Sequence, residues 1–302
     1  MSKPSPGSGA SCDHPSRLNV VSSDLLRTPS AREADGAVVR VDPATEVADL
    51  GGRGWEWISF SAHELEPGSR IERPGDGQEV AVVVLDGTVS LVAAGRSFGE
   101  VGGRGSVFDA RPSPLLLVAP GEGLEIEARD MATIALAAAP GGDVRVTTLV
   151  DPGTVRVESR GEGATARTVR HLLPPEAHAG RLIVVEVLTP GGHWSSYPPH
   201  KHDEQDLPRE TRLEELYYYR FQRPSGFAFQ RVYTADRSLD EALTPMDGDL
   251  VLVPRGYHAV GVPAGYECYY LNVMAGPVRE WRFTLDPDHA WLMDWSPQAA
   301  DD

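Results

Sequence analysis

The sequence LVLVPRGYH occupies residues 250–258, and a similar stretch, LLLVAPGEG, occupies residues 115–123. Each stretch is a short apolar run that ends in a turn containing Pro or Gly, which is typical of antiparallel β-structure. A second pair consists of EVAVVV at residues 79–84 and ELYYYR at residues 215–220. The first pair is 135 positions apart and the second 136. Two matches at almost one spacing indicate two copies of one β domain.

The rest of the chain agrees with an all-β fold. Helical periodicity is nearly absent, and short runs rich in Val, Ile, Leu and Tyr recur between Gly, Pro and Asp turns. The apolar runs are diluted between residues 140 and 170, where we place the boundary between the two copies. We therefore expect a flexible tail at residues 1–18, an N-terminal domain at residues 19–150, and a C-terminal domain with an aromatic tail at residues 151–302.

Charge and composition exclude several classes of function. The 302 residues carry a formal net charge of −16, and such an acidic surface repels nucleic-acid phosphates and anionic membranes. No apolar run approaches the roughly 18 residues that a membrane-spanning helix needs, and the first residues lack the apolar core of a signal peptide. The two cysteines allow no disulfide framework. These features predict a cytoplasmic protein without nucleic-acid or membrane partners.

Histidine and glutamate residues of the C-terminal copy form a candidate metal site. His200 and His202 are two positions apart, so they point to one face of a regular strand. Strand parity favours Glu215 over Glu214 as a fourth ligand, although the loop before them leaves the choice open. His258 follows a turn at the end of an apolar strand, where its side chain can point inward. Three imidazoles and one carboxylate suit zinc, iron, manganese or nickel.

The first copy lacks these ligands. Gly123 stands where His258 stands in the second copy, and no His-x-His pair precedes Glu79. We therefore expect a metal site only in the second copy. That copy also carries a charged segment at residues 203–214, between the His pair and the glutamates. Its position predicts either a lid at the rim of a pocket or a solvated insertion.

Longer motifs resemble one enzyme family. The stretches WSSYPPHKHD (194–203), EELYYY (214–219), VPRGYH (253–258) and YLNVMAGP (270–277) resemble the 5-deoxy-glucuronate isomerases of myo-inositol catabolism. That family is bicupin and is related to 4-deoxy-L-threo-5-hexosulose-uronate ketol-isomerase. The resemblance implies two tandem cupin (jelly-roll-like) β-barrels with a metal site only in the second. It also implies one divalent metal ion, for which we expect zinc, with manganese, iron or nickel as alternatives. The metal ligands of the related ketol-isomerase carry over onto His200, His202, Glu215 and His258.

The resemblance further implies a reaction on a small sugar acid. This reaction is the aldose–ketose isomerisation of 5-deoxy-D-glucuronate to 5-dehydro-2-deoxy-D-gluconate through a metal-stabilised enediol(ate). A positioned base would move the proton between C2 and C1. Tyr217 and Gln230 are the candidate catalytic residues, with a metal-bound hydroxide as another possible base. The candidate substrate-binding residues are Arg255, Arg231, Tyr270 and Asn272, the two arginines being cations for the substrate carboxylate.

Two other functions use the same residues. A cupin dioxygenase would combine the three histidines and the glutamate with iron and oxygen. A non-catalytic sugar-binding cupin would bind a ligand without turnover. The sequence leaves the oligomeric state open.

Overall fold

The computed structural model describes residues 23–45 and 50–294, so the tail predicted at residues 1–18 lies outside the described residues. Within these ranges the chain is built almost entirely of β-strands, and its helical segments are short 3-10 turns. The turns are η1 (Leu50–Gly52), η2 (Pro152–Thr154), η3 (Gly163–Thr165) and η4 (Ala290–Met293).

None of the described helices is long and apolar enough to cross a membrane. The cytoplasmic location expected from the sequence stays a prediction.

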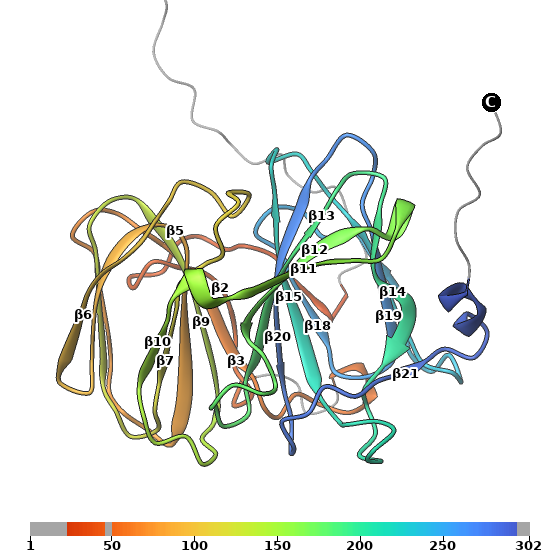
Figure 1. Cartoon of the computed structure of the whole chain (residues 1–302), viewed down its shortest axis with the longest axis horizontal. Coiled ribbons are helices and arrows are strands. Elements are labelled where there is room, and N and C mark those ends of the chain that lie inside the picture. Colours follow the sequence, from red (N-terminus) through yellow and green to blue (C-terminus); the bar gives the residue numbers. More distant parts are fainter. Residues whose placement is uncertain (1–22, 46–49, 295–302) are drawn as a thin grey trace, which may run out of the picture.

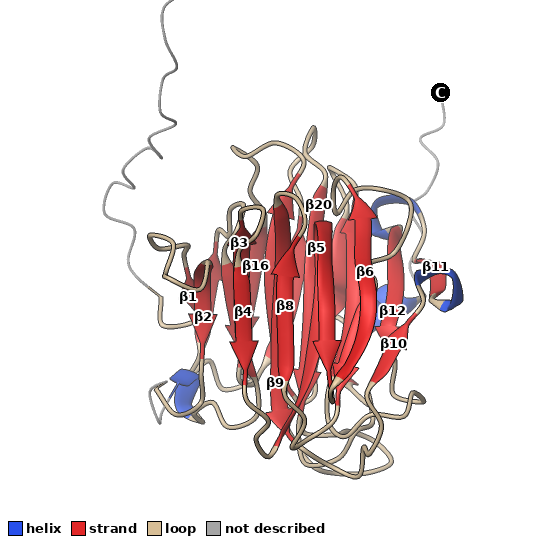
Figure 2. Cartoon of the chain, turned by 90° about the vertical axis from the view of Figure 1, so that its left-hand side faces the viewer, coloured by secondary structure: helices blue, strands red, loops and turns tan. Residues whose placement is uncertain are grey.

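The first unit, on the left of Figure 1, is a curled sheet of nine strands. Its strands are β2 (Ala37–Val41), β3 (Ser59–Leu65), β4 (Arg70–Arg73), β5 (Gln78–Ala93), β6 (Arg96–Arg104), β7 (Leu115–Val118), β8 (Leu124–Ala128), β9 (Ala132–Pro140) and β10 (Thr148–Val150). The long strand β5 pairs with β7 and β9 in its first half and with β6 and β8 in its second half. The strands that pair with the first half of β5 form one layer, and those that pair with its second half form another. The sheet folds over itself because β5 runs through both layers. Figure 2 shows the outer layer, with β4, β8, β5 and β6 side by side.

The second unit, on the right of Figure 1, consists of a seven-stranded and a five-stranded sheet. The larger sheet has the order β1-β18-β15-β20-β13-β12-β11, and the smaller has the order β17-β16-β19-β14-β21. Its strands are β1 (Leu26–Arg27), β11 (Arg156–Arg160), β12 (Arg167–Leu173), β13 (Ile183–Thr189), β14 (Trp194–Lys201), β15 (Glu214–Phe221), β16 (Phe229–Tyr233), β17 (Asp240–Leu243), β18 (Leu250–Val253), β19 (Tyr257–Gly261), β20 (Cys268–Ala275) and β21 (Thr284–Leu285). The predicted boundary assigns β1 to the N-terminal domain, but β1 pairs with β18 of the second unit.

The two units pack against each other through their large sheets. Along β5 the side chains of Val80, Val82 and Val84 belong to the core inside the first unit. The alternate side chains of β5 belong to a core that continues into the second unit. Phe60 of the first unit contacts Tyr218 of the second, with ring centroids 5.7 Å apart. Because successive side chains of a strand point to opposite faces, β5 supplies one core inside the first unit and one core between the units.

Strand register corrects the spacing of the internal repeat. Val80 pairs with Val118 in the first unit, and Glu215 pairs with Val253 in the second. Val118 and Val253 are equivalent positions of the repeated stretches, so the counterpart of Glu215 is Val80 and not Glu79. A shift of one residue exchanges the two faces of a strand. An apolar side chain therefore fills the position of the carboxylate in the first unit.

Buried carboxylates join the two units in a reciprocal way. Glu79 of the first unit accepts hydrogen bonds from the backbone N–H groups of Gly180 at 2.6 Å and Leu182 at 2.7 Å. Its counterpart Glu214 accepts one from the backbone N–H of Trp57, at 2.8 Å. Each carboxylate thus holds backbone of the other unit. Burial raises the pKa of Glu214 to about 7, even though these N–H groups favour its charged form.

Candidate metal centre and cavity

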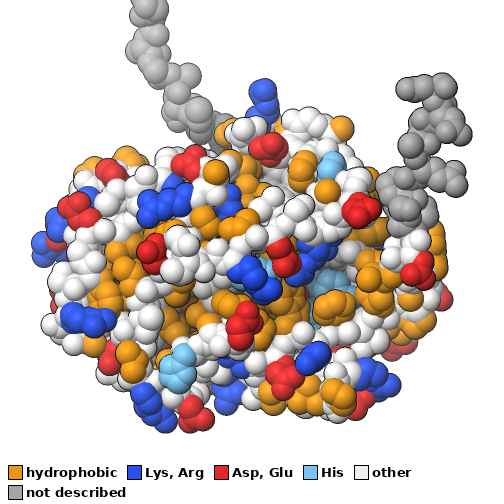
Figure 3. Space-filling model, in the orientation of Figure 1, with side chains coloured by type: hydrophobic (Ala, Val, Ile, Leu, Met, Phe, Trp, Pro, Cys, Tyr) orange, Lys and Arg blue, Asp and Glu red, His pale blue; other side chains and the backbone are white. Residues whose placement is uncertain are grey.

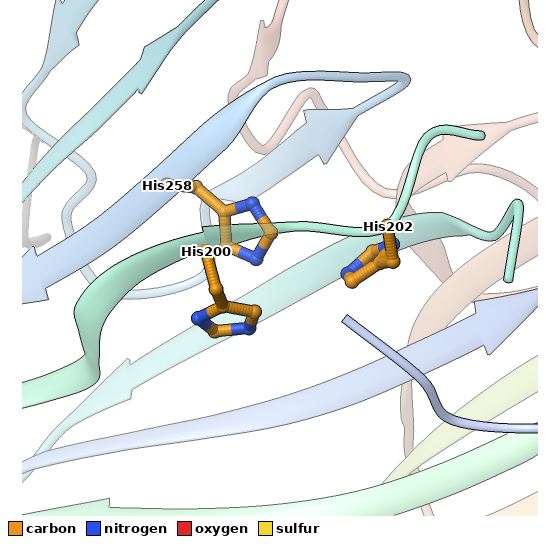
Figure 4. A group of neighbouring side chains, drawn as sticks. All are labelled: His200, His202 and His258. Carbon is orange, nitrogen blue, oxygen red and sulfur yellow. The ribbon is translucent and has the colours of Figure 1, made fainter. Parts of the chain in front are cut away.

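Three histidines converge inside the second unit. His200 of β14 and His258 of β19 are directly paired across the smaller sheet, and His202 follows the end of β14. The ligand nitrogens of the three side chains all lie within 4.8 Å of one another. Figure 4 shows the rings coming from neighbouring segments and turning toward a common space. Among the residues that the structure describes, this is the only group of its kind found.

Backbone carbonyls fix the tautomers of these imidazoles. The Nδ1 atom lies 3.0 Å from the Leu213 carbonyl in His202, and 3.0 Å from the Gly256 carbonyl in His258. The Nδ1 atom of His200 lies 3.3 Å from a carbonyl of its own strand. A carbonyl only accepts, so each Nδ1 must carry the proton and donate it. In the neutral ring the Nε2 atom then has a free lone pair for a metal ion.

Glu215 completes the donor set. Its Oε2 atom lies 2.6 Å from Nε2 of His202 and 2.9 Å from Nε2 of His258. Its other oxygen accepts a hydrogen bond from the side-chain amide of Asn272. Glu214 lies on the opposite face of β15 and contacts backbone of the first unit instead. The structure therefore brings Glu215, and not Glu214, to the histidines.

Charges in this cluster favour a neutral imidazole at His200 and an ionised carboxylate at Glu215. Burial beside the other two imidazoles lowers the pKa of His200 to about 3. Burial by itself raises the pKa of Glu215, but His258 and His202 outweigh it and hold the pKa well below its usual value. Burial likewise lowers the pKa of His202, yet the Glu215 carboxylate outweighs it and raises that pKa. The short contact between His202 and Glu215 requires a proton between the two groups. A metal cation bound there would take the place of that proton.

The donor set fits a divalent metal ion. Nε2 of His258 is fully buried and has no hydrogen-bond partner, although the Glu215 carboxylate is close. Buried polar atoms without a partner are rare in native proteins, and a bound metal ion would give this nitrogen the partner that it lacks. Three imidazole nitrogens and one carboxylate oxygen are ligands that zinc and neighbouring transition metals accept.

A pair of matched variants tests which glutamate is the ligand. We expect Glu215→Gln to weaken metal binding by about 10- to 100-fold or more, because a neutral amide replaces the only anionic ligand. Glu214→Gln removes a charge at the adjacent position but leaves the cluster intact, so its metal affinity should match that of the original protein. Equilibrium dialysis against zinc and manganese measures both. Equal losses in the two variants would contradict the placement of the ligand.

The charged segment at residues 203–214 holds the backbone next to the histidine cluster. Asp203 accepts a hydrogen bond from the backbone N–H of Gly256 at 2.9 Å and pairs with Lys201 at 2.6 Å. Lys201 also pairs with Glu210, at 2.9 Å. Gly256 has φ of +95°, a conformation that favours glycine, and lies two residues before His258. The segment thus connects the backbone around His202 to the turn before His258. None of its residues lines the cavity described next.

A cavity of about 750 Å³ opens beside the histidine cluster, and His200 and Glu215 form part of its wall. Strands β11, β12, β13, β14 and β20 supply most of its polar and aliphatic lining, and the segment around β21 and η4 supplies apolar residues. On the face seen in Figure 3, histidine atoms are visible in the right-hand half, with hydrophobic and basic atoms around them. The cavity is large enough for a six-carbon sugar acid beside the histidine cluster.

The structure brings some predicted site residues to this cavity. Tyr270 and Asn272 line it. Tyr217 lies behind the wall, and its hydroxyl is 3.0 Å from the hydroxyl of Ser196, which does line the cavity. Gln230 is buried deeper in the unit, where it accepts a hydrogen bond from a tyrosine hydroxyl at 2.8 Å, and it is not part of the lining.

The structure does not bring the two predicted substrate-binding arginines to the cavity. Arg231 is on the outside of β16, where both arms of its guanidinium bind Asp240 at 2.8 Å. Arg255 reaches away from the site and donates to the backbone carbonyl of Gly51. The arginines that line the cavity are Arg160 and Arg167, which sequence reasoning missed. One available signal was the alternation of Arg167 with the apolar Val169 at the start of β12, because both side chains face inward.

Comparisons with a family model and with known proteins point to the same family. The profile of the KduI/IolB family matches residues 25–292. The chain is 44% identical over 272 residues to a protein of Geobacillus kaustophilus named 5-deoxy-glucuronate isomerase, covering 90% of this chain and 96% of that protein. It is 40% identical over 272 residues to the Bacillus subtilis protein of the same name, covering 89% and 98%.

Among solved structures there is also a similar protein described as IolB-like. The crystal structure of an IolB-like protein from Salmonella typhimurium has a TM-score of 0.84 and 40% identity, and the match covers 89% of this chain and 99% of that one. Bacillus subtilis oxalate decarboxylase matches with a TM-score of 0.59 at 13% identity, covering 88% of this chain and 80% of that one, which supports the fold alone. The expected all-β, bicupin fold is confirmed.

Proposed function

Because the chain belongs to the KduI/IolB family, we propose that it is an isomerase that converts 5-deoxy-D-glucuronate to 5-dehydro-2-deoxy-D-gluconate. The observation that carries the proposal is the identity of 40–44% with proteins named 5-deoxy-glucuronate isomerase over about 90% of the chain. The cavity beside a buried cluster of three imidazoles and one carboxylate provides a site of suitable size and chemistry.

We propose that His200, His202, Glu215 and His258 hold one divalent metal ion in this enzyme. Zinc is the ion we expect, with manganese, iron or nickel as alternatives, because all four accept imidazole and carboxylate ligands. When bound, such an ion supplies Lewis acidity that polarises the substrate carbonyl and acidifies the proton on the neighbouring carbon.

The residues of the chain have to orient the substrate, move one proton from C2 to C1, and move the hydroxyl proton from the C2 oxygen to the C1 oxygen. Asn272 reaches the cavity and also donates to Glu215, so it holds the carboxylate in place. We propose that Tyr217 takes part in the proton transfer through Ser196, whose hydroxyl contacts both Tyr217 and the cavity. Tyr270, whose hydroxyl is 3.0 Å from that of Ser195, forms part of the wall and positions the substrate. Gln230 orients Tyr219 behind this layer.

The reaction can be followed directly. We expect 5-deoxy-D-glucuronate to lose its aldehyde-hydrate NMR signals and to form a ketone when the purified protein is added. Chelation of the metal should stop the conversion, and restoring zinc or manganese should restart it. In deuterated water the product should carry deuterium at C1, because the transferred proton exchanges with solvent. Metal-loaded protein that leaves the substrate unchanged would contradict the proposal, and oxygen uptake with bound iron would favour the dioxygenase alternative.

A further inference from the structure

Two arginines face each other at the wall of the cavity. Arg160 of β11 and Arg167 of β12 are directly paired across the two strands, and both line the cavity. Like charges at directly opposed positions of an antiparallel pair are destabilising. An anion bound between the two guanidinium groups would offset this repulsion.

The two side chains differ in how their charges are compensated. Arg160 forms an ion pair with Glu158 and lies over the ring of Trp281, at 5.7 Å from its centroid. Arg167 donates a hydrogen bond to the backbone carbonyl of Thr165 at 2.9 Å. Among the described residues no carboxylate lies within 4.0 Å of its guanidinium. Burial lowers the pKa of Arg167, and the positive charge of Arg160 lowers it further.

Two arginines elsewhere in the protein are compensated by protein groups. Arg104 pairs with the Glu186 carboxylate at 2.7 Å. Arg279 donates to backbone carbonyls that include those of Leu182 at 2.8 Å and Ala177 at 2.6 Å. A guanidinium offers five N–H donors in a fixed fork. Arg167 lines the cavity, and among the described residues only the Thr165 carbonyl accepts a hydrogen bond from its guanidinium.

We infer that Arg167, assisted by Arg160, binds the carboxylate of the sugar acid and makes the enzyme specific for acids over neutral sugars. The inference rests on the proposed function, because it assigns the charged end of the substrate to the arginines and the reacting end to the metal centre. Arg167 shares the cavity with His200 and Glu215, so one molecule can reach both. The planar fork of arginine matches a carboxylate with two parallel hydrogen bonds.

The test compares Arg167→Gln and Arg167→Lys with a matched control, Arg156→Gln. Arg156 lies on β11 with its side chain 56% exposed and outside the cavity lining, so its replacement removes an equal charge and leaves every residue of the cavity wall in place. We expect Arg167→Gln to raise KM about 10- to 100-fold, the usual effect of losing charged hydrogen bonds. The KM of Arg167→Lys should lie between those of the original protein and Arg167→Gln, because lysine keeps the positive charge but lacks the planar fork of donors. The KM of Arg156→Gln should equal that of the original protein.

Ligand binding separates this inference from the proposed reaction. The affinities for D-glucuronate and D-glucose are measured by calorimetry on each metal-loaded protein. The original protein should bind the acid at least about 10-fold more tightly, and Arg167→Gln should lose this preference. That result supports the carboxylate site even if no isomerisation is found. Normal turnover with unchanged KM and unchanged glucuronate affinity in Arg167→Gln would overturn it, as would the absence of any preference in the original protein.

Thermal unfolding without ligand checks for a structural role. Removing a charge that faces Arg160 relieves repulsion, so Arg167→Gln should unfold at the same temperature as the original protein or slightly above it. A clear fall in the unfolding temperature would instead identify Arg167 as a structural residue and overturn the inference.

Discussion

The variant His258→Ala is expected to lose its metal ion and its isomerase activity while keeping the fold. The side chain of His258 is fully buried, and its Nε2 atom has no hydrogen-bond partner and lies 2.9 Å from the Glu215 carboxylate. Its removal leaves three donors and takes away the nitrogen opposite His200 on the paired strand. Turnover should fall by about 10³-fold or more, since a catalytic metal contributes several kcal/mol to lowering the barrier.

The measurements are the metal content of the purified variant and the rate of ketone formation by NMR. His178→Ala is the control, because His178 is exposed and lies outside the cluster. Far-ultraviolet circular dichroism establishes that the strands are retained. If Ala is not tolerated at this buried position, His258→Gln keeps a polar side chain of similar volume. Full metal content and full activity in a folded variant would show that His258 is not a ligand.

Replacement of Glu186 by Ala is expected to cost about 3–5 kcal/mol of the free energy of unfolding. Glu186 is fully buried between the two units, 2.7 Å from Arg104 and 3.6 Å from Arg170. It also accepts a hydrogen bond from the hydroxyl of Tyr269, at 3.0 Å. Without the carboxylate, two buried guanidinium groups lose their counter-ion. Removing one partner from a buried ion pair is costly because the remaining charge stays out of water.

Urea unfolding of the full chain measures this loss. Glu186→Gln keeps the shape of the side chain and removes its charge, so its loss of unfolding free energy should be smaller than that of Glu186→Ala. Glu66→Ala is the matched surface variant: Glu66 pairs with Arg32 in an exposed ion pair, and such pairs contribute at most about 1 kcal/mol. A loss below about 1 kcal/mol for Glu186→Ala would mean that the buried pair does not stabilise the packing of the two units.

The sequence predicted the fold class because the fold depends on local patterns. Short apolar runs that alternate with Gly and Pro turns define strands wherever they occur, and the repeat of 115–123 at 250–258 indicates two similar units. The spacing of 136 between residues 79 and 215 was one residue too long. Cross-strand pairing with Val118 and Val253 sets the register, and a single sequence does not contain that information.

The candidate metal centre was also accessible from the sequence. A His-x-His pair and a histidine after a turn are local features, and strand parity separated Glu215 from Glu214. The structure places the three histidines and Glu215 close together, and their role as metal ligands stays a prediction.

The sequence by itself determined an all-β chain with two related halves and one cluster of candidate metal ligands. Only the tertiary structure showed which arginines line the cavity. Arg231 is engaged by Asp240 on the neighbouring strand, and Arg255 by backbone more than 200 positions away. Arg167 faces the cavity beside Arg160. The sequence gives the charge of each side chain. Whether another group of the protein neutralises that charge depends on contacts that form only when the chain folds.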